Sequence, residues 1–304
     1  MSCPLCGAPA GEPWAWVRDM EYFTGPEEHT YHRCAACDVL YLAPMPVDRL
    51  AEIYPPNYYA FGGGAGGLLL AVKAWLDRRM FRRLLAAVPG ERLAVLDVGG
   101  GEGWLLGQLR AADARVAHTC VVDLDARAEA RALAQGHAFF RGPIEVFEAD
   151  RPYDVVLLLN LIEHVADPRA VLARVRACLA PGGRVLVKTP NVDAWDARLF
   201  RHRHWGGYHC PRHWVLFTRA SFTRVAAEAG LAVARFGYTQ GAPFWATSVL
   251  AMLAARGWVD LSAERPAVYH PLFPWLSLAF AALDFTRAPF APTSQMVCEL
   301  VAAP

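Results

Sequence analysis

The pattern of apolar and polar positions predicts alternating strands and helices from residue 93 onward. Short, almost wholly apolar runs are typical of strands buried on both faces, and the segments between them place apolar residues at helical spacing. The expected strands are Leu93–Val98, Val116–Leu124, Ala138–Arg141, Tyr153–Asn160, Arg184–Thr189, Leu231–Tyr238 and Ser294–Val301. The expected helices are Gly103–Ala112, Ala126–Gln135, Ile144–Glu148, Pro168–Leu179 and Ser221–Ala229. This alternation predicts an α/β fold with a doubly wound, seven-stranded and mostly parallel sheet.

Residues 239–292 depart from this alternation because they contain two strongly apolar helical segments. These segments, 242–253 and 271–283, are joined by the polar turn 256–264 and precede the last expected strand. Neither reaches the roughly 18 apolar residues that a membrane span needs. Such an apolar helical insertion is suited to a lid over an apolar acceptor, a homodimer face or an interfacial membrane anchor, and the pattern leaves these three open.

The first 61 residues carry two C-x-x-C pairs with 27 residues between them. The pairs are Cys3 with Cys6 and Cys34 with Cys37. Two such pairs can supply the four thiolates of a tetrahedral zinc site, and a metal would provide folding energy that this segment's small apolar core cannot. We therefore expect a zinc-ribbon-like module with a structural Zn²⁺. A redox pair or free thiols are the alternative, with His29 and His32 as possible substitute ligands.

A glycine-rich stretch at 62–67 is expected to be a flexible connector. The predicted organisation is an N-terminal module at 1–61, a linker with an amphipathic helix (Leu68–Val88) at 62–90, and a large domain at 91–304. Before the connector, Tyr54, Tyr58 and Tyr59 are expected to dock the module onto the large domain or to cover the active site as a flap. The basic side chains of the helix favour a solvated face over a membrane-bound one; they are Lys73, Arg78, Arg79, Arg82 and Arg83.

Composition and charge narrow the classes of partner. Hydrophobic residues make up 55% of the chain and the formal net charge is +1, which indicates a folded protein without the electrostatic signature of nucleic-acid binding. The N-terminus lacks the basic and apolar regions of a signal peptide, and the cysteines fit a reducing compartment. We therefore expect a cytoplasmic protein with no nucleic-acid partner, and peripheral membrane contact stays open.

The first expected strand of the large domain ends in Asp97 and leads into the glycine-rich turn 98–103. Trp104 stands where a dinucleotide-binding turn has its third glycine, so a pyrophosphate site is not expected. Asp123 ends the next strand, where a carboxylate can accept hydrogen bonds from ribose hydroxyls. These positions predict a ligand that contains a nucleoside with a free ribose diol.

Four segments, in this order, resemble the successive motifs of class I S-adenosylmethionine-dependent methyltransferases, and most closely their ubiquinone-biosynthesis-type small-molecule branch. They are Val95–Gly103, Asp123, Tyr153–Val165 and Pro181–Gly183, and the similarity covers roughly residues 90–240. The cysteine-rich front end is similar to a module in a subset that includes deoxysugar C-methyltransferases. The resemblance implies a Rossmann-like methyltransferase fold with S-adenosyl-L-methionine as cofactor.

The resemblance also implies roles for the residues of the glycine-rich turn. Gly99 and Gly101 would receive the methionine portion of the cofactor, Asp97 would orient it, and Asp123 would hold the ribose. The other implied cofactor-binding residues are Leu124, Ile144 with its neighbours Pro143 and Glu145, Asn160 and Leu161. Two alternatives stay open: Asp97 could cap the turn, and Asp123 could cap the next helix, with Asp125 then binding the ribose.

The segment 202–214 contains four histidines, two arginines and two tryptophans. In the resembling branch a similar P-R-H element lies beside the acceptor pocket. Histidine titrates in the range that a general base needs, so His209 or His213 is the expected base, with His164 as a further candidate. Tyr208 and Arg212 are expected to orient the acceptor. The alternatives are a structural network around Arg212 and His213, and a second zinc site that includes Cys210.

The expected function is therefore transfer of a methyl group from S-adenosylmethionine to a small-molecule acceptor. A sugar, a quinone-like compound or another secondary metabolite would offer the carbon or oxygen nucleophile. A non-catalytic or regulatory protein that binds S-adenosylmethionine is the main alternative, and nicotinamide oxidoreduction and nucleic-acid methylation are less favoured.

Overall fold

The computed structural model describes residues 2–55, 58 and 68–303, with the backbone alone at 68–73. Across these residues the main sheet has seven strands in the order β10-β11-β8-β7-β4-β5-β6. The strands are β4 (Leu93–Val98), β5 (Val116–Asp123), β6 (Ala138–Arg141), β7 (Tyr153–Leu159), β8 (Leu179–Pro190), β10 (Leu231–Thr239) and β11 (Gln295–Ala302). β11 runs antiparallel to β8 and β10, whereas β4 to β8 pair in parallel. The predicted seven-stranded, mostly parallel sheet is confirmed.

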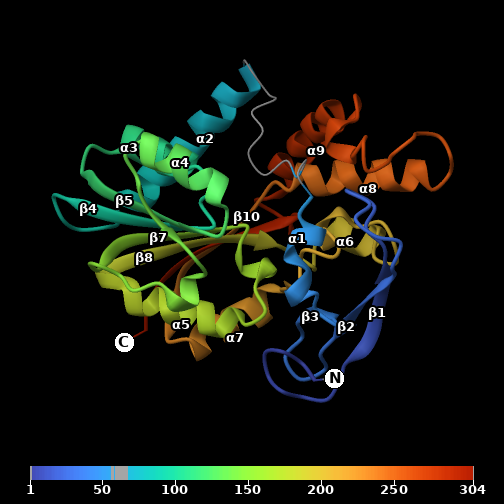
Figure 1. Cartoon of the computed structure of the whole chain (residues 1–304), viewed down its shortest axis with the longest axis horizontal. Coiled ribbons are helices and arrows are strands. Elements are labelled where there is room, and N and C mark those ends of the chain that lie inside the picture. The colour runs from blue at the N-terminus through green and yellow to red at the C-terminus, as the bar shows by residue number, and fades with distance from the viewer. Residues whose placement is uncertain (1, 56–57, 59–67, 304) are drawn as a thin grey trace.

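Helices cover both faces of this sheet, as Figure 1 shows. They are α2 (Leu68–Leu85), α3 (Trp104–Ala112), α4 (Ala126–Ala134), α5 (Pro168–Cys178) and α7 (Arg219–Glu228). Side chains of a strand alternate between the two faces. Val95 of β4 accordingly joins a buried cluster with Phe81 and Leu106, while Leu96 joins the opposite cluster with Leu172. The topology switches at β4, which lies between β5 and β7, and ligands of such sheets bind at the carboxyl ends beside this point.

The N-terminal residues form a second sheet that also takes in a strand from far along the chain. Within the described residues its order is β1 (Glu12–Val17), β2 (His29–Arg33), β3 (Leu40–Ala43) and β9 (Val215–Leu216). Tyr41 pairs with Val215, so the module and the large domain share one antiparallel sheet. The sequence pattern does not predict β3 or β9, because neither of these short apolar segments shows an alternation of apolar and polar positions.

A short 3-10 turn, η1 (Val47–Arg49), and the helix α1 (Leu50–Ile53) follow the second sheet. The predicted connector at 62–67 and Tyr59 lie outside the described residues. In the main sheet β8 begins at Leu179 instead of Arg184, because Leu179 pairs with Tyr153 ahead of a register shift.

The two apolar helices expected before the last strand are present as α8 (Ala242–Ala254) and α9 (Phe273–Arg287). They pack against each other, and the rings of Trp245 and Phe280 stack with centroids 4.7 Å apart. Both lie at the upper right of Figure 1, above the short helix α6 (Trp195–Leu199). Among the described residues, every helix is either too short or too polar to cross a membrane. The remaining 3-10 turns are η2 (Ile144–Val146), η3 (Ile162–His164), η4 (Gly206–Tyr208) and η5 (Ala267–Tyr269).

Candidate active site and metal centre

The glycine-rich turn between β4 and α3 has a backbone that only glycine adopts easily. Gly99 and Gly101 have φ values of +73° and +52°. A Cβ atom on Gly99 would lie 2.8 Å from Cδ1 of Leu161, so the chain after β7 closes against this turn. Asp123 at the end of β5 fixes the turn from the other side, since its Oδ2 accepts a hydrogen bond from the Gly101 N–H at 2.9 Å.

The predicted ribose ligand Asp123 is not the cap of the following helix. Asp125 caps α4 by accepting a hydrogen bond from the backbone of Arg127. Asp123 instead accepts from Gly101 and from the N–H of Asp125, the latter at 2.9 Å through Oδ1. Each carboxylate oxygen can accept more than one hydrogen bond, so Asp123 can still receive ribose hydroxyls.

Asp97, which ends β4 together with Val98, is a buried carboxylate with an unused acceptor. It is 1% exposed, and its Oδ2 has no hydrogen-bond partner among the described residues. Burial, with a smaller contribution from the charge of Asp123, raises the pKa of Asp97 to about 8. An orphan acceptor of this kind is suited to a ligand that brings a hydrogen-bond donor or a positive charge.

The other predicted cofactor residues lie after the carboxyl ends of neighbouring strands. Ile144 is buried in η2 after β6, and Leu124 is 60% exposed after β5. Asn160 and Leu161 follow β7, and Asn160 has the left-handed φ of +58°. The sheet therefore brings these residues to the same edge as Asp97 and the turn.

Three histidines form a cluster beyond this edge. The ring centroids of His164 and His213 are 4.6 Å apart, and those of His209 and His213 are 5.0 Å apart. Two tyrosines from the N-terminal region bind this cluster: the Tyr54 hydroxyl lies 2.9 Å from Nδ1 of His164, and the Tyr58 hydroxyl lies 3.1 Å from Nε2 of His209. The predicted docking of these tyrosines onto the large domain agrees with both contacts.

His209 is the histidine of this cluster with a carboxylate partner at hydrogen-bond distance. Its Nδ1 contacts the side chain of Glu21, and its Nε2 faces Tyr58. With a proton on Nδ1 shared with the carboxylate, Nε2 is an acceptor aimed at a hydroxyl group. Glu21 lies on the loop after β1 and belongs to no motif, so no sequence signal identifies it as a partner of His209.

His164 and His213 are in more restricted settings. Nδ1 of His213 donates to the carbonyl oxygen of Gly207 at 2.7 Å. Burial, followed by the charges of neighbouring histidines, lowers the pKa of His213 well below its usual value and that of His164 to about 3. Both side chains are therefore held neutral at physiological pH.

Arg212 is enclosed by protein on every side. It is 0% exposed and pairs with Asp19 at 2.7 Å. Its Nε and Nη1 donate to the carbonyl oxygens of Ile53 and Cys210. Tyr208 is likewise buried, and its hydroxyl donates to the carbonyl oxygen of Arg201. These contacts match the structural network that the sequence left open as an alternative role.

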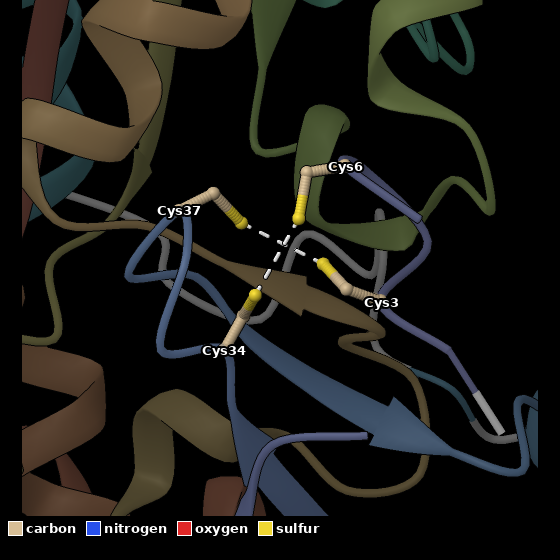
Figure 2. A group of neighbouring side chains, drawn as sticks. All are labelled: Cys3, Cys6, Cys34 and Cys37. Atoms are coloured by element: carbon tan, nitrogen blue, oxygen red, sulfur yellow. Dashed lines mark hydrogen bonds between the residues drawn. The ribbon is translucent and has the colours of Figure 1, made fainter. Parts of the chain in front are cut away.

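The four cysteines of the N-terminal module converge on one point, as Figure 2 shows. The sulfur atoms of Cys3 and Cys37 are 3.6 Å apart, those of Cys6 and Cys34 are 3.5 Å apart, and no disulfide joins any of the chain's cysteines. A tetrahedral zinc ion with bonds of about 2.3 Å holds its sulfurs about 3.8 Å apart, so the donor set fits this metal.

A second group of ligand atoms lies within the histidine cluster. Glu163, His164 and His213 bring one such atom each within 4.8 Å of one another. Glu163 accepts hydrogen bonds from Thr189 and Asn160, and burial raises its pKa to about 7. The set could hold a divalent ion or form a hydrogen-bonded network. Cys210, which the alternative of a second zinc site includes, contacts the carbonyl oxygen of Val17.

More than half of the chain matches a family of known proteins. The sequence profile of the methyltransferase domain family matches residues 72–235, which is more than half of the chain. The chain belongs to this family. The match extends from α2 into β10 and includes the turn, Asp97 and Asp123. The family and the fold are those of class I S-adenosylmethionine-dependent methyltransferases, as the sequence predicts.

Two curated relatives of this chain carry different names. A tRNA 5-carboxymethoxyuridine methyltransferase of Escherichia coli (strain K12) is 32% identical over 147 residues, 45% of this chain and 52% of the relative. A ubiquinone biosynthesis O-methyltransferase of Aromatoleum aromaticum is 32% identical over 136 residues, 41% of this chain and 52% of the relative. The chain thus spans about half the length of the curated relatives it matches.

The solved structure of a proposed sarcosine dimethylglycine methyltransferase from Galdieria sulphuraria is similar in fold. Its TM-score is 0.50 at 15% identity, over 76% of this chain and 85% of that chain. At this identity the similarity concerns the fold alone.

Replacing Asp19 by Asn is expected to destabilise the protein by about 3 kcal/mol, because Arg212 would stay buried without its counter-ion. Although burial opposes it, the charge of Arg212 lowers the pKa of Asp19 to about 2. This folded-state pKa lies below the value of about 3.9 that Asp has in the unfolded chain. The ion pair therefore stabilises the fold above about pH 4, and this stabilisation is lost as the pH falls toward 2. Urea unfolding at pH 2–7 measures both effects. Asp38→Asn, at an exposed ion pair, is the control, and equal stability of the Asp19 variant and wild type at pH 7 would contradict the prediction.

Asp97→Asn is expected to stabilise the ligand-free protein at alkaline pH. The pKa of Asp97 is higher in the folded protein than in the unfolded chain, so folding favours the protonated side chain. Its contribution to stability is therefore fully present below about pH 4 and is lost as the pH rises through about 8. The neutral amide avoids this loss. Thermal melting at pH 4.5 and 8.5 should show an advantage of the variant that grows with pH, at about 2–4 °C per kcal/mol. A variant that melts below wild type at pH 8.5 would show that Asp97 is satisfied in the folded protein.

Proposed function

We propose that this protein transfers the methyl group of S-adenosylmethionine to a small-molecule acceptor that loses a proton at the methylated atom. The observation that carries the proposal is the carboxylate–imidazole–hydroxyl arrangement of Glu21, His209 and Tyr58 beside the strand edge. Sugars, quinone-like phenols and other hydroxyl-bearing metabolites are acceptors of this chemistry.

The cofactor half of the site rests on residues after β4, β5, β6 and β7. S-adenosylmethionine supplies an electrophilic methyl group on a sulfonium. The unpartnered oxygen of Asp97 is suited to the ammonium group of the methionine portion, and Asp123 to the ribose hydroxyls. The side chains proposed to flank the adenine are Ile144 and Leu124, and those proposed for the sulfonium side are Asn160 and Leu161.

The acceptor half rests on His209 as general base. Glu21 fixes the tautomer of His209 and stabilises the imidazolium that forms when Nε2 takes a proton. The hydroxyl of Tyr58 marks the position from which a hydroxyl can give its proton to Nε2. An acceptor hydroxyl in that position would give its proton to Nε2 while its oxygen attacks the methyl group in line. Most of the catalysis in such a displacement comes from holding the oxygen and the methyl group in this alignment.

The remaining residues of the segment are positioning residues in this proposal. Arg212 and Tyr208 hold the backbone on both sides of His209 through their contacts with Ile53, Asp19 and Arg201. His164 and His213 are neutral packing partners of the His209 ring.

We also propose that Cys3, Cys6, Cys34 and Cys37 bind a structural zinc ion. Thiolates at these distances repel one another unless a cation lies between them. The bound metal would fix the two ends of the β1–β2 segment, and this segment carries Asp19 and Glu21. Zinc would therefore act on the reaction by holding the partner of His209 in place.

A tRNA acceptor is the second candidate, because the Escherichia coli relative carries a tRNA methyltransferase name. The formal net charge of +1 does not favour it. A binding protein without turnover is the third. Two assays separate these possibilities. A gel-shift titration with bulk tRNA tests the tRNA acceptor, and a methyl-transfer assay on hydroxylated small molecules tests for turnover.

His209→Ala is expected to lower kcat by about 10²–10⁴-fold and leave the affinity for S-adenosylhomocysteine unchanged. Glu21→Gln should lower kcat less and shift the pH profile, since the imidazolium loses its counter-charge. Radiolabelled methyl transfer to the accepted small molecule measures kcat, and heat-shift titration with S-adenosylhomocysteine measures cofactor affinity. His202→Ala is the matched control, because it removes an exposed histidine of the same segment.

Two results would contradict this mechanism. Full activity of the His209 variant would exclude His209 as the base. Loss of S-adenosylhomocysteine binding in the same variant would show that the segment is structural. The absence of any heat shift with S-adenosylhomocysteine in wild type would overturn the proposed function as a whole.

The purified protein is expected to contain one zinc ion per chain. Chelation should lower the melting temperature and turnover together, since structural zinc contributes about 10 kcal/mol or more of binding free energy in small zinc-binding peptides. Plasma mass spectrometry measures the metal. The double variant Cys34→Ser/Cys37→Ser should lose it, whereas Cys178→Ala should keep it. A metal-free protein whose melting is unaffected by chelator would refute the zinc site.

A further inference from the structure

We propose that the protein docks on anionic lipid membranes through an exposed apolar face formed by α6, α9 and the turn after α9. The exposed side chains of this face, called the α6–α9 face, are Trp195, Leu199, Leu272, Trp275, Leu278, Phe285 and Phe290. Trp275 is 70% exposed and Phe290 is 89% exposed. A monomeric protein rarely exposes so many large apolar side chains together unless a partner covers them.

The helix α9 is apolar on both of its sides. Its inner side packs on α8 through Phe280 and Trp245. Its outer side presents Leu272, Trp275 and Leu278, at a spacing of three residues. A helix that is apolar all round is buried in a protein core or in lipid, and α9 has a core on one side only.

The charges close to this face in the sequence favour lipid over a second copy of the chain. Both carboxylates of the described stretches 195–204 and 270–292, Asp196 and Asp284, are 0% exposed. The exposed charged side chains of the same stretches are the arginines Arg198 and Arg203. Anionic headgroups would neutralise these arginines, whereas a second copy would bring the same charges face to face.

The two helices belong to one surface because α6 adjoins the end of α9. The guanidinium of Arg287 lies 3.9 Å from the ring centre of Trp195. Buried Asp196 accepts a hydrogen bond from Ser294, which also contacts Asp284. Helices that lie in the headgroup region of a membrane typically combine tryptophan and phenylalanine with arginine. At 15 residues α9 is about 22 Å long, too short to span a bilayer.

The docked face would lie one helix away from the proposed acceptor site. On the side of η4, Ser248 of α8 accepts a hydrogen bond from the backbone of Gly206. Thr247 of α8 lies 3.4 Å from Glu21. Membrane docking would thus place this site close to molecules dissolved in the bilayer, although the docking itself does not depend on the proposed function.

Co-sedimentation with vesicles tests the proposal on the full chain. Vesicles of phosphatidylcholine with one third phosphatidylglycerol should bind the protein, and vesicles of phosphatidylcholine alone should bind it at least several-fold more weakly. Trp275→Ser/Leu278→Ser should lower the partition coefficient about tenfold or more. Arg198→Gln/Arg203→Gln should lower it about tenfold and reduce its dependence on salt. Trp16→Ser, which removes an exposed tryptophan from β1, should leave it unchanged.

The replaced side chains are exposed in the native protein, so the variants are expected to fold. Circular dichroism and thermal melting check this. Equal sedimentation of wild type and the Trp275→Ser/Leu278→Ser variant would overturn the proposal. So would a lack of binding of wild type to the anionic vesicles. A dimer in analytical ultracentrifugation that dissociates in the same variant, without vesicle binding by wild type, would assign the face to a second copy instead.

Discussion

The buried ion pair of Arg212 and Asp19 is the interaction on which the acceptor side of the molecule depends. A fully buried guanidinium is tolerated only where its donors are satisfied, and here the carboxylate of Asp19 and two backbone carbonyls satisfy them. One carbonyl belongs to Ile53 and the other to Cys210, so the pair joins three segments that are distant in sequence. Asp19 in turn accepts hydrogen bonds from Tyr22 and Thr24, which orders the loop that carries Glu21. A charge that cannot be left unpaired thereby fixes the partner of His209.

The two halves of the candidate site differ in how far the sequence predicts them. The cofactor half is local: strand, turn and helix follow one another within Leu93–Ala112, and the carboxyl ends of parallel strands meet at one edge by topology. Asp97 and the turn could therefore be placed from their positions alone. The acceptor half is made by contacts across most of the chain. Glu21 and Tyr58 contact His209 from 188 and 151 residues away, and no periodicity or motif carries that information.

The fold shows the same division. The seven strands of the main sheet are long and apolar enough to be recognised, and their bounds agree to within a few residues. The exceptions are informative. β3 and β9 have only four and two residues, and long-range contacts of Arg212 and Tyr31 help to hold their segments together. The hydroxyl of Tyr31 donates to the carbonyl oxygens of Tyr208 and His213, a long-range contact that composition does not reveal. The pairing of β3 with β9 thus links the predicted module to the predicted domain through one sheet.

Desolvation then separates three histidines that the sequence presents as equivalent. The rings of His164, His209 and His213 pack against one another in edge-on or tilted arrangements. His213 gives its Nδ1 proton to a backbone carbonyl, and burial holds His164 and His213 in the neutral state. His209 alone of the three has its Nδ1 on a carboxylate and its Nε2 toward a hydroxyl. Burial makes a protonated imidazole costly at His164 and His213, and His209 is the ring that the proposed mechanism uses as the base. This difference follows from the loop that Asp19 and Arg212 hold in place, and not from the histidines themselves.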